Sequence, residues 1–166
     1  MNIEILKVGE LHTNCYIVSK NGKAIIIDPG AEGNRIIESV KNYEVVGILV
    51  THFHHDHIWA LVELEKHYKL FRNVCTNENF NYEIIYNPGH SEDSISFYFR
   101  KEKIMFTGDF LFYHTIGRVD LKGSSIEHMK ESLEMISKYD DDIKIYPGHG
   151  WSSILGEEKK HFREYF

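Results

Sequence analysis

The chain has 166 residues, 42% hydrophobic and 27% charged, which is enough to bury the core of one domain. Its formal net charge of −6 gives no basic face for a phosphate backbone and argues against nucleic acid as a partner. The two cysteines form neither a C-x-x-C pair nor a disulfide framework, and we find no membrane-length apolar stretch and no charged-then-apolar leader. We therefore expect one cytoplasmic domain over residues 1–166, without a membrane partner.

Apolar patterns predict short strands that alternate with helices, which indicates an α/β or mixed class. The predicted strands are 3–8, 14–18, 23–30 with its terminal turn, 45–50, 74–76, 83–86, 94–99, 103–106 and 143–146. Asn21-Gly22 is a typical hairpin turn. The predicted helices are 34–41, 58–69, a segment from a capping box at Ser124 to about residue 138, and a short one from 156 onward.

The most specific stretch is residues 51–57, Thr-His-Phe-His-His-Asp-His, in a chain that has 11 histidines. It directly follows the apolar strand 45–50, and α/β sheets place their chemistry at such strand ends. In an extended segment, side chains two residues apart point the same way, which puts His52, His54 and Asp56 on one side. This clustering of histidine and aspartate predicts a metal site rather than a solvated polar loop.

Three further strand ends carry a possible ligand beside a glycine: His90, Asp109 and His149. Glycine allows a sharp turn and a close approach of the backbone to a metal. Asp28, at the end of another strand, is interpreted as a residue that orients the ligand loop. The alternative is an ordinary turn aspartate before Pro29-Gly30.

The order of these motifs resembles the metallo-β-lactamase superfamily over nearly the whole chain. The motifs are 27–30, 51–57, 88–90, 107–109 and 147–150. Within it, segments 108–112 and 117–121 are similar to the glyoxalase II (hydroxyacylglutathione hydrolase)-like branch, and 147–158 to its short single-domain bacterial members. The resemblance implies an α/β fold, a four-layer sandwich of two mixed β-sheets packed face to face with helices outside.

The resemblance also implies two divalent metal ions, zinc first, with iron or manganese suited to the same ligands. Carried over to this sequence, it assigns His52, His54 and His90 to the first metal and Asp56, His57 and His149 to the second, with Asp109 bridging both. His55 receives no assignment and is expected to face solvent or support a ligand. The remaining histidines are expected at the surface: His12, His67, His114, His128 and His161.

The implied activity is a metal-dependent hydrolase that cleaves a thioester such as an S-acylglutathione, or a related ester, with a metal-bridging hydroxide. Asp56 and Asp109 are the candidate catalytic residues. For the small-molecule substrate, Arg118 could bind a carboxylate or instead pair with Asp120, and Tyr113 is a candidate for the pocket wall.

The sequence departs from the family at Ala60, where glycine is usual, and at 91–93. We also expect no counterpart of the C-terminal helical domain with which larger members of the family hold glutathione. The sequence leaves three alternatives open. They are a mononuclear iron persulfide dioxygenase that uses His52, His90 and Asp109, a lactone hydrolase, and a non-catalytic metal-binding module.

Overall fold

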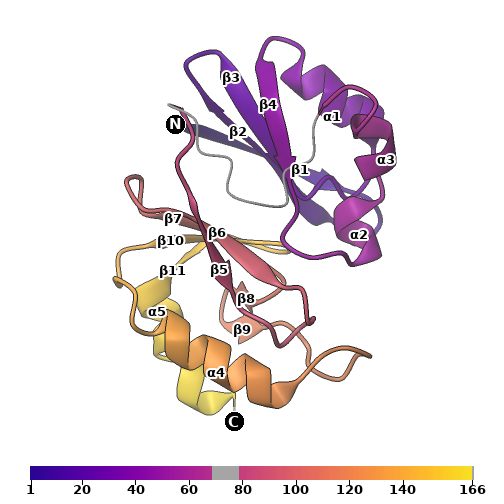
Figure 1. Ribbon diagram of the computed structural model, residues 1–166. Helices are drawn as coiled ribbons and strands as arrows, with labels where there is room; N and C mark the ends of the chain where they lie inside the picture. Colours follow the sequence, from indigo (N-terminus) through magenta and orange to yellow (C-terminus); the bar gives the residue numbers. More distant parts are fainter. Residues whose placement is uncertain (69–78, 166) are drawn as a thin grey trace. The chain divides into compact units, whose positions relative to one another are not determined.

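The computed structural model describes residues 1–68 and 79–165. The chain divides into two compact units, Met1–Tyr82 (unit 1) and Glu83–Phe166 (unit 2), and each contains a mixed sheet with helices packed against it (Figure 1). The predicted strand 74–76 and part of the loop predicted to follow it lie outside the described residues. Among the described residues, no helix is long and apolar enough to cross a membrane.

Unit 1 contains a four-stranded sheet in the order β1-β2-β3-β4, in which only β3 and β4 run parallel. The strands are β1 (Asn2–Val8), β2 (Thr13–Lys20), β3 (Lys23–Ile27) and β4 (Glu44–Leu49). Asn21 and Gly22 both have positive φ, 53° and 76°, as a two-residue hairpin turn requires. The helix α1 (Gly33–Val40) packs on this sheet through the buried Ile36 and Val40.

The segment predicted as one helix over 58–69 is two short helices, α2 (His55–Ile58) and α3 (Leu61–Leu64). The helix breaks because the Ala60 N–H donates to the Pro29 carbonyl, at 3.1 Å, rather than to a carbonyl of its own preceding turn. The single-helix prediction was therefore wrong. A tertiary backbone contact, which no sequence periodicity encodes, ends α2 directly after the ligand motif.

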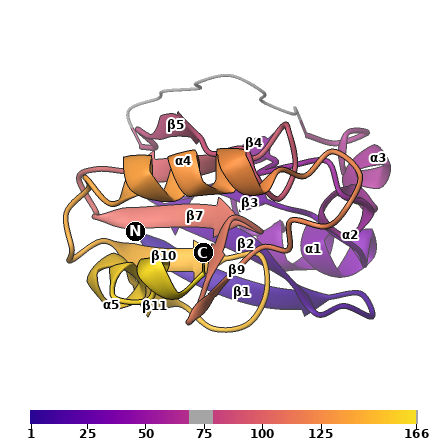
Figure 2. The same cartoon turned by 90° about the horizontal axis from the view of Figure 1, so that it is seen from below.

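Unit 2 contains a five-stranded sheet in the order β11-β10-β7-β6-β5, in which only β7 and β10 run parallel. Its strands are β5 (Glu83–Tyr86), β6 (Ile95–Phe99), β7 (Ile104–Gly108), β10 (Lys144–Pro147) and β11 (Ser153–Ile154). The helices of this unit are α4 (Ile126–Ile136) and α5 (Leu155–Lys159), followed by a 3-10 turn over Phe162–Glu164 (Figure 2). They share one cluster of buried side chains with the sheet.

Two details of unit 2 differ from the sequence prediction. The residue that caps α4 is Ser125, not Ser124: its hydroxyl accepts from the His128 N–H at 3.2 Å. Ile126 is 41% exposed because it stands at the first position of the helix. A small hairpin, β8 (Leu111–Phe112) with β9 (Thr115–Ile116), was not predicted, since two-residue strands have no readable period.

The two mixed sheets with flanking helices confirm the predicted fold class. In both sheets the ligand-bearing loops follow strand ends, as the motif spacing predicted: β4 in unit 1, and β5, β7 and β10 in unit 2. The prediction of a single domain over residues 1–166 stays a prediction.

Candidate metal centre

Seven histidine and aspartate side chains belong to groups that could hold metal ions, among the residues that the structure describes. Unit 1 supplies four and unit 2 supplies three: His52, His54, Asp56 and His57, then His90, Asp109 and His149. They are the same seven residues that the sequence motifs singled out.

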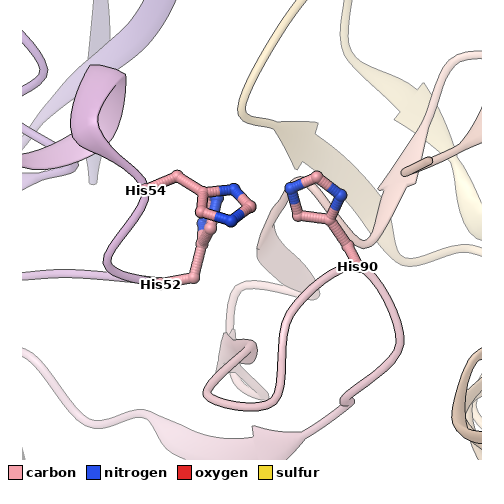
Figure 3. A group of neighbouring side chains, drawn as sticks. All are labelled: His52, His54 and His90. Atoms are coloured by element: carbon pink, nitrogen blue, oxygen red, sulfur yellow. The ribbon is translucent and has the colours of Figure 1, made fainter. Parts of the chain in front are cut away.

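In unit 1 the ligand motif leaves the end of β4 and enters α2. The His52 and His57 side chains are almost fully buried, and their ring centroids lie 4.2 Å apart. The His54 ring stands edge-on to His52 at 4.7 Å (Figure 3). The three imidazole rings therefore lie close enough together to offer their nitrogens as metal ligands.

Asp28 determines which nitrogen of two of these rings carries the proton. Its buried carboxylate accepts hydrogen bonds from the Thr51 N–H and Thr51 hydroxyl, both at 2.7 Å, and from His57 Nδ1 at 2.9 Å. Because a carboxylate only accepts, His57 Nδ1 carries hydrogen and the ring's lone pair is on Nε2. Because the Thr51 hydroxyl donates its hydrogen bond to Asp28, it can only accept one from His52 Nδ1, at 3.1 Å. The His52 lone pair is then also on Nε2.

The Asp56 carboxylate is oriented by Thr13, whose hydroxyl donates to Asp56 Oδ2 at 2.9 Å. His57 Nε2 lies 3.6 Å from the same oxygen. Gly30 packs against the Asp56 main chain, where an added Cβ would lie 1.8 Å from the carbonyl oxygen. Thr13 was missed from the sequence, because nothing distinguishes a threonine at the start of a strand.

In unit 2, His90 Nδ1 donates to the backbone carbonyl of Arg118 at 3.0 Å, which again leaves the lone pair on Nε2. His90 Nε2 and His149 Nε2 lie 3.6 Å and 3.5 Å from Asp109 Oδ2. Two ligand atoms on one tetrahedral zinc ion lie about 3.3 Å apart, given metal–ligand distances of about 2.0–2.1 Å. These separations therefore suit ligands of a shared ion better than hydrogen bonds.

Two glycines allow this arrangement in unit 2. A Cβ added to Gly117 would lie 1.8 Å from the Asp109 carbonyl oxygen and 2.9 Å from His90 Cβ. A Cβ added to Gly89 would lie 2.6 Å from Met129 Cα in α4. The backbone around the unit 2 ligands is packed too closely for any side chain at either position.

The donor set fits divalent metals. Five imidazoles and two carboxylates suit zinc, iron or manganese. In three of the histidines, the hydrogen-bond partner of Nδ1 presents Nε2 as the ligand atom: His52, His57 and His90. Such partners of metal-binding histidines set the ring's orientation and raise its basicity.

The candidate substrate residue Arg118 is exposed and makes a two-pronged pair with Asp120, at 2.7 Å and 2.8 Å. This pair raises the pKa of Arg118 and lowers the pKa of the Asp120 carboxyl. It is the ion pair that the sequence left open as the alternative to substrate binding.

Tyr113, the other candidate substrate residue, lies at the tip of the β8–β9 hairpin, 48% exposed and stacked on His114 at 4.0 Å. With Phe112, His149 and Trp151 it lines a hollow of about 360 Å³ within unit 2. Trp151, 74% exposed, was not selected from the sequence. The one feature of the sequence that could have indicated a role for Trp151 is its position directly after His149-Gly150.

The histidines without a predicted ligand role lie toward the surface. His55 is exposed and packs edge-on against Trp59, with ring centroids 4.1 Å apart. The five lone histidines, four of them exposed and the last half-buried, join none of the metal-binding groups found among the described residues: His12, His67, His114, His128 and His161.

Comparison with known families identifies the class. The family model described as the metallo-beta-lactamase superfamily matches residues 8–70 and 69–149. The chain belongs to this superfamily, as the order of its motifs predicted. It is a metallo-hydrolase of that class, with histidine and aspartate groups that can bind metal.

Known relatives and solved structures are similar to the chain over most of its length. It is 30% identical over 203 aligned positions to the hydroxyacylglutathione hydrolase GloC of Haemophilus influenzae, across 96% of both chains. The fold is similar to that of the BLEG-1 B3 metallo-beta-lactamase, with a TM-score of 0.86 at 24% identity over 96% of this chain and 97% of that one. It is also similar to TTHA1623, solved in a di-iron-bound form, with a TM-score of 0.82 at 22% identity over 98% of this chain and 100% of that one.

Proposed function

We propose that this protein hydrolyses a small-molecule thioester, such as an S-acylglutathione, or a related ester. The observation that carries the proposal is the oriented ligand set, in which hydrogen bonds to Nδ1 present the Nε2 atoms of His52, His57 and His90. The relationship to a hydroxyacylglutathione hydrolase supports the thioester as the substrate class.

In this proposal two divalent ions bind, zinc first, with iron or manganese as alternatives. His52, His54 and His90 hold one ion; Asp56, His57 and His149 hold the other; Asp109 serves both. The di-iron form of TTHA1623 supports two ions in this fold and keeps iron open as their identity.

Two such ions, when bound, supply an activated water and polarise a carbonyl oxygen. With the ions bound, Asp56 would accept the proton that this water loses, at a carboxylate that Thr13 holds in position. Asp109 keeps its carboxylate between His90 and His149. A departing thiolate is stable enough to leave without an acid to protonate it, so no further catalytic acid is required.

The substrate would lie against the hollow that Tyr113 and Trp151 line beside His149. Arg118 would meet a substrate carboxylate by exchanging its present partner Asp120. This exchange would appear as a raised KM for anionic thioesters in Arg118→Ala, with little change for uncharged ones.

The deciding experiment measures metal content and turnover together, on protein purified without added metal. We expect about two ions per chain and hydrolysis of S-lactoylglutathione or a related thioester. His149→Ala should then lose one ion, whereas the exposed His114→Ala should keep both. One iron per chain, retained in His149→Ala and accompanied by oxygen uptake on glutathione persulfide, would overturn the proposal.

A further inference from the structure

Unit 1 has a second hollow, on the side of Asp56, that the proposed reaction does not use. Its volume is about 550 Å³, and its lining includes Val8, Glu10, Leu11, His55, Asp56 and Trp59. We call it the Trp59 hollow. Since Asp56 is a candidate metal ligand, a group bound here would lie directly beside the reacting centre.

Two large apolar side chains that line this hollow are exposed to solvent. Trp59 and Leu11 are each 65% exposed, on different elements: Trp59 directly after α2, and Leu11 in the turn between β1 and β2. A single exposed apolar residue needs no explanation, but two that line one hollow provide apolar area for a ligand to cover. The edge-on contact with His55 holds the Trp59 ring in place.

The turn that carries Leu11 is tied to the start of α1. The Gly9 N–H donates to Glu32 Oε1 at 2.9 Å, and Arg35 donates both to Glu32 Oε2 and to the Lys7 carbonyl, each at 2.9 Å. The Arg35 and Gly9 bonds to Glu32 lower the pKa of its carboxyl, the Arg35 bond most. The carboxylate therefore stays charged near neutral pH, and the Leu11 wall is already formed before a ligand arrives.

The hollow offers no cationic side chain to an anion. Its lining has no lysine or arginine among the described residues, and besides the candidate ligand Asp56 it has one carboxylate, that of Glu10. The carboxylates of a thiol such as glutathione would find no cationic side chain to pair with here. The other half of a thioester, an uncharged acyl chain, needs no such partner and gains from covering Trp59 and Leu11.

We propose that the Trp59 hollow binds the acyl chain of the substrate and selects uncharged apolar chains over short polar ones. This rests on the proposed thioester or ester hydrolysis, because it assigns the acyl side of that substrate. Trp59 is then a specificity residue.

The first test compares thioesters of one thiol whose acyl chains lengthen from acetyl to hexanoyl. We expect kcat/KM to rise by up to about fourfold per methylene, and this rise to drop below about twofold in Trp59→Ala. Trp59→Phe should keep most of it. The matched control is Val62→Ala, an apolar residue of α3 that is 73% exposed and outside the hollow. An equal chain-length dependence in native protein and Trp59→Ala would overturn the proposal.

A second test observes binding without turnover. The chain has two tryptophans, so Trp151→Phe leaves Trp59 as its only indole fluorophore. S-hexylglutathione, a thioether that cannot be hydrolysed, should shift the Trp59 emission to shorter wavelength in a saturable way, and S-methylglutathione should not. If no thioester is cleaved but this shift is seen, the proposed reaction fails and the hollow stands. Emission that responds to protein concentration and not to the thioether would identify a contact between copies and refute the acyl site.

Discussion

The two units hold their candidate ligands by different means. Unit 1 has four ligands in the stretch 51–57, supported by side chains: Asp28 bonds His57, and Thr13 bonds Asp56. Unit 2 spreads three ligands over three strand ends, and its support for His90 is main chain, the Arg118 carbonyl. Single side-chain substitutions should therefore damage the unit 1 ligands, whereas the unit 2 ligands should respond mainly to changes that move the backbone.

The units also share one device. In each, a glycine packs against the carbonyl oxygen of the aspartate ligand: Gly30 against Asp56 and Gly117 against Asp109. An added Cβ would lie 1.8 Å from the oxygen in both cases, far inside van der Waals contact. We therefore expect substitutions of Gly30 and Gly117 to lower the stability by similar amounts, although the two units hold their ligands differently.

The largest effect should come from Gly30→Ala and Gly117→Ala, each of which must displace the backbone of an aspartate ligand. We expect each to lower the free energy of unfolding by about 3 kcal/mol, measured by denaturant titration. Gly123→Ala is the control: its φ of 87° costs about 1 kcal/mol, but its Cβ would meet nothing within 4 Å. If Gly117→Ala were as stable as Gly123→Ala, the backbone at Asp109 would be able to shift at little cost in free energy, and the prediction would be wrong.

The next effect tests the side-chain support of unit 1. Asp28→Asn replaces an acceptor of three hydrogen bonds with an amide whose NH₂ meets donors, so His57 loses its orientation. We expect metal affinity to fall by roughly 10–100-fold, as measured by competition with a chelating dye. Asp120→Asn, at an exposed pair in unit 2, should leave the affinity unchanged. Equal affinities for native protein and Asp28→Asn would refute the role of Asp28.

A smaller loss is expected when Thr13 is changed. Thr13→Val removes the hydroxyl that bonds Asp56 Oδ2 and should lower the free energy of unfolding by about 1.5 kcal/mol, since a bond to a charged group is lost. Thr13→Ser keeps the hydroxyl and should retain most of this stability. Thermal unfolding of the native protein and both variants measures the difference. Indistinguishable serine and valine variants would mean that the bond contributes little.

The main-chain support of unit 2 can be tested at the start of α4. The Ser125 N–H donates to the Gly89 carbonyl at 2.8 Å, and this bond survives the loss of the side chain. Ser125→Ala should therefore cost about 1 kcal/mol of stability through the lost cap while metal affinity stays unchanged. Ser124→Ala should cost less. A marked loss of metal from Ser125→Ala would contradict the view that main chain holds the His90 loop.

The smallest effect should follow Arg118→Ala, because His90 bonds the Arg118 carbonyl and not its side chain. The exposed pair with Asp120 is screened by solvent, so the stability change should lie below that of Ser125→Ala. The folded state lowers the pKa of Asp120, so the pair stabilises above the unfolded value of about 3.9 and fades as pH falls through the folded value. Unfolding measured from pH 7 to pH 3 should show the stabilities of native protein and Arg118→Ala converging as the pH falls.

Much of the fold was readable from the sequence because its strands are long enough to show a period. The strand Glu83–Tyr86 was predicted to the residue, and most others to within two. The errors have two causes. The break between α2 and α3 depends on the Pro29 carbonyl, a partner distant in sequence, and the β8–β9 hairpin is too short to have a pattern.

The sequence by itself determined the class of site, because a cluster of four histidines and an aspartate, with three later glycine-flanked ligands, has few other uses. Only the tertiary structure decided which ring nitrogen is the candidate metal ligand and which groups hold the ring in that orientation. Hydrogen-bond partners such as Asp28 with His57, or the Arg118 carbonyl with His90, lie 29 and 28 residues apart in sequence. Exposure was also a tertiary property: a tryptophan in a sequence predicts burial, and the fold leaves Trp59 in water beside Asp56.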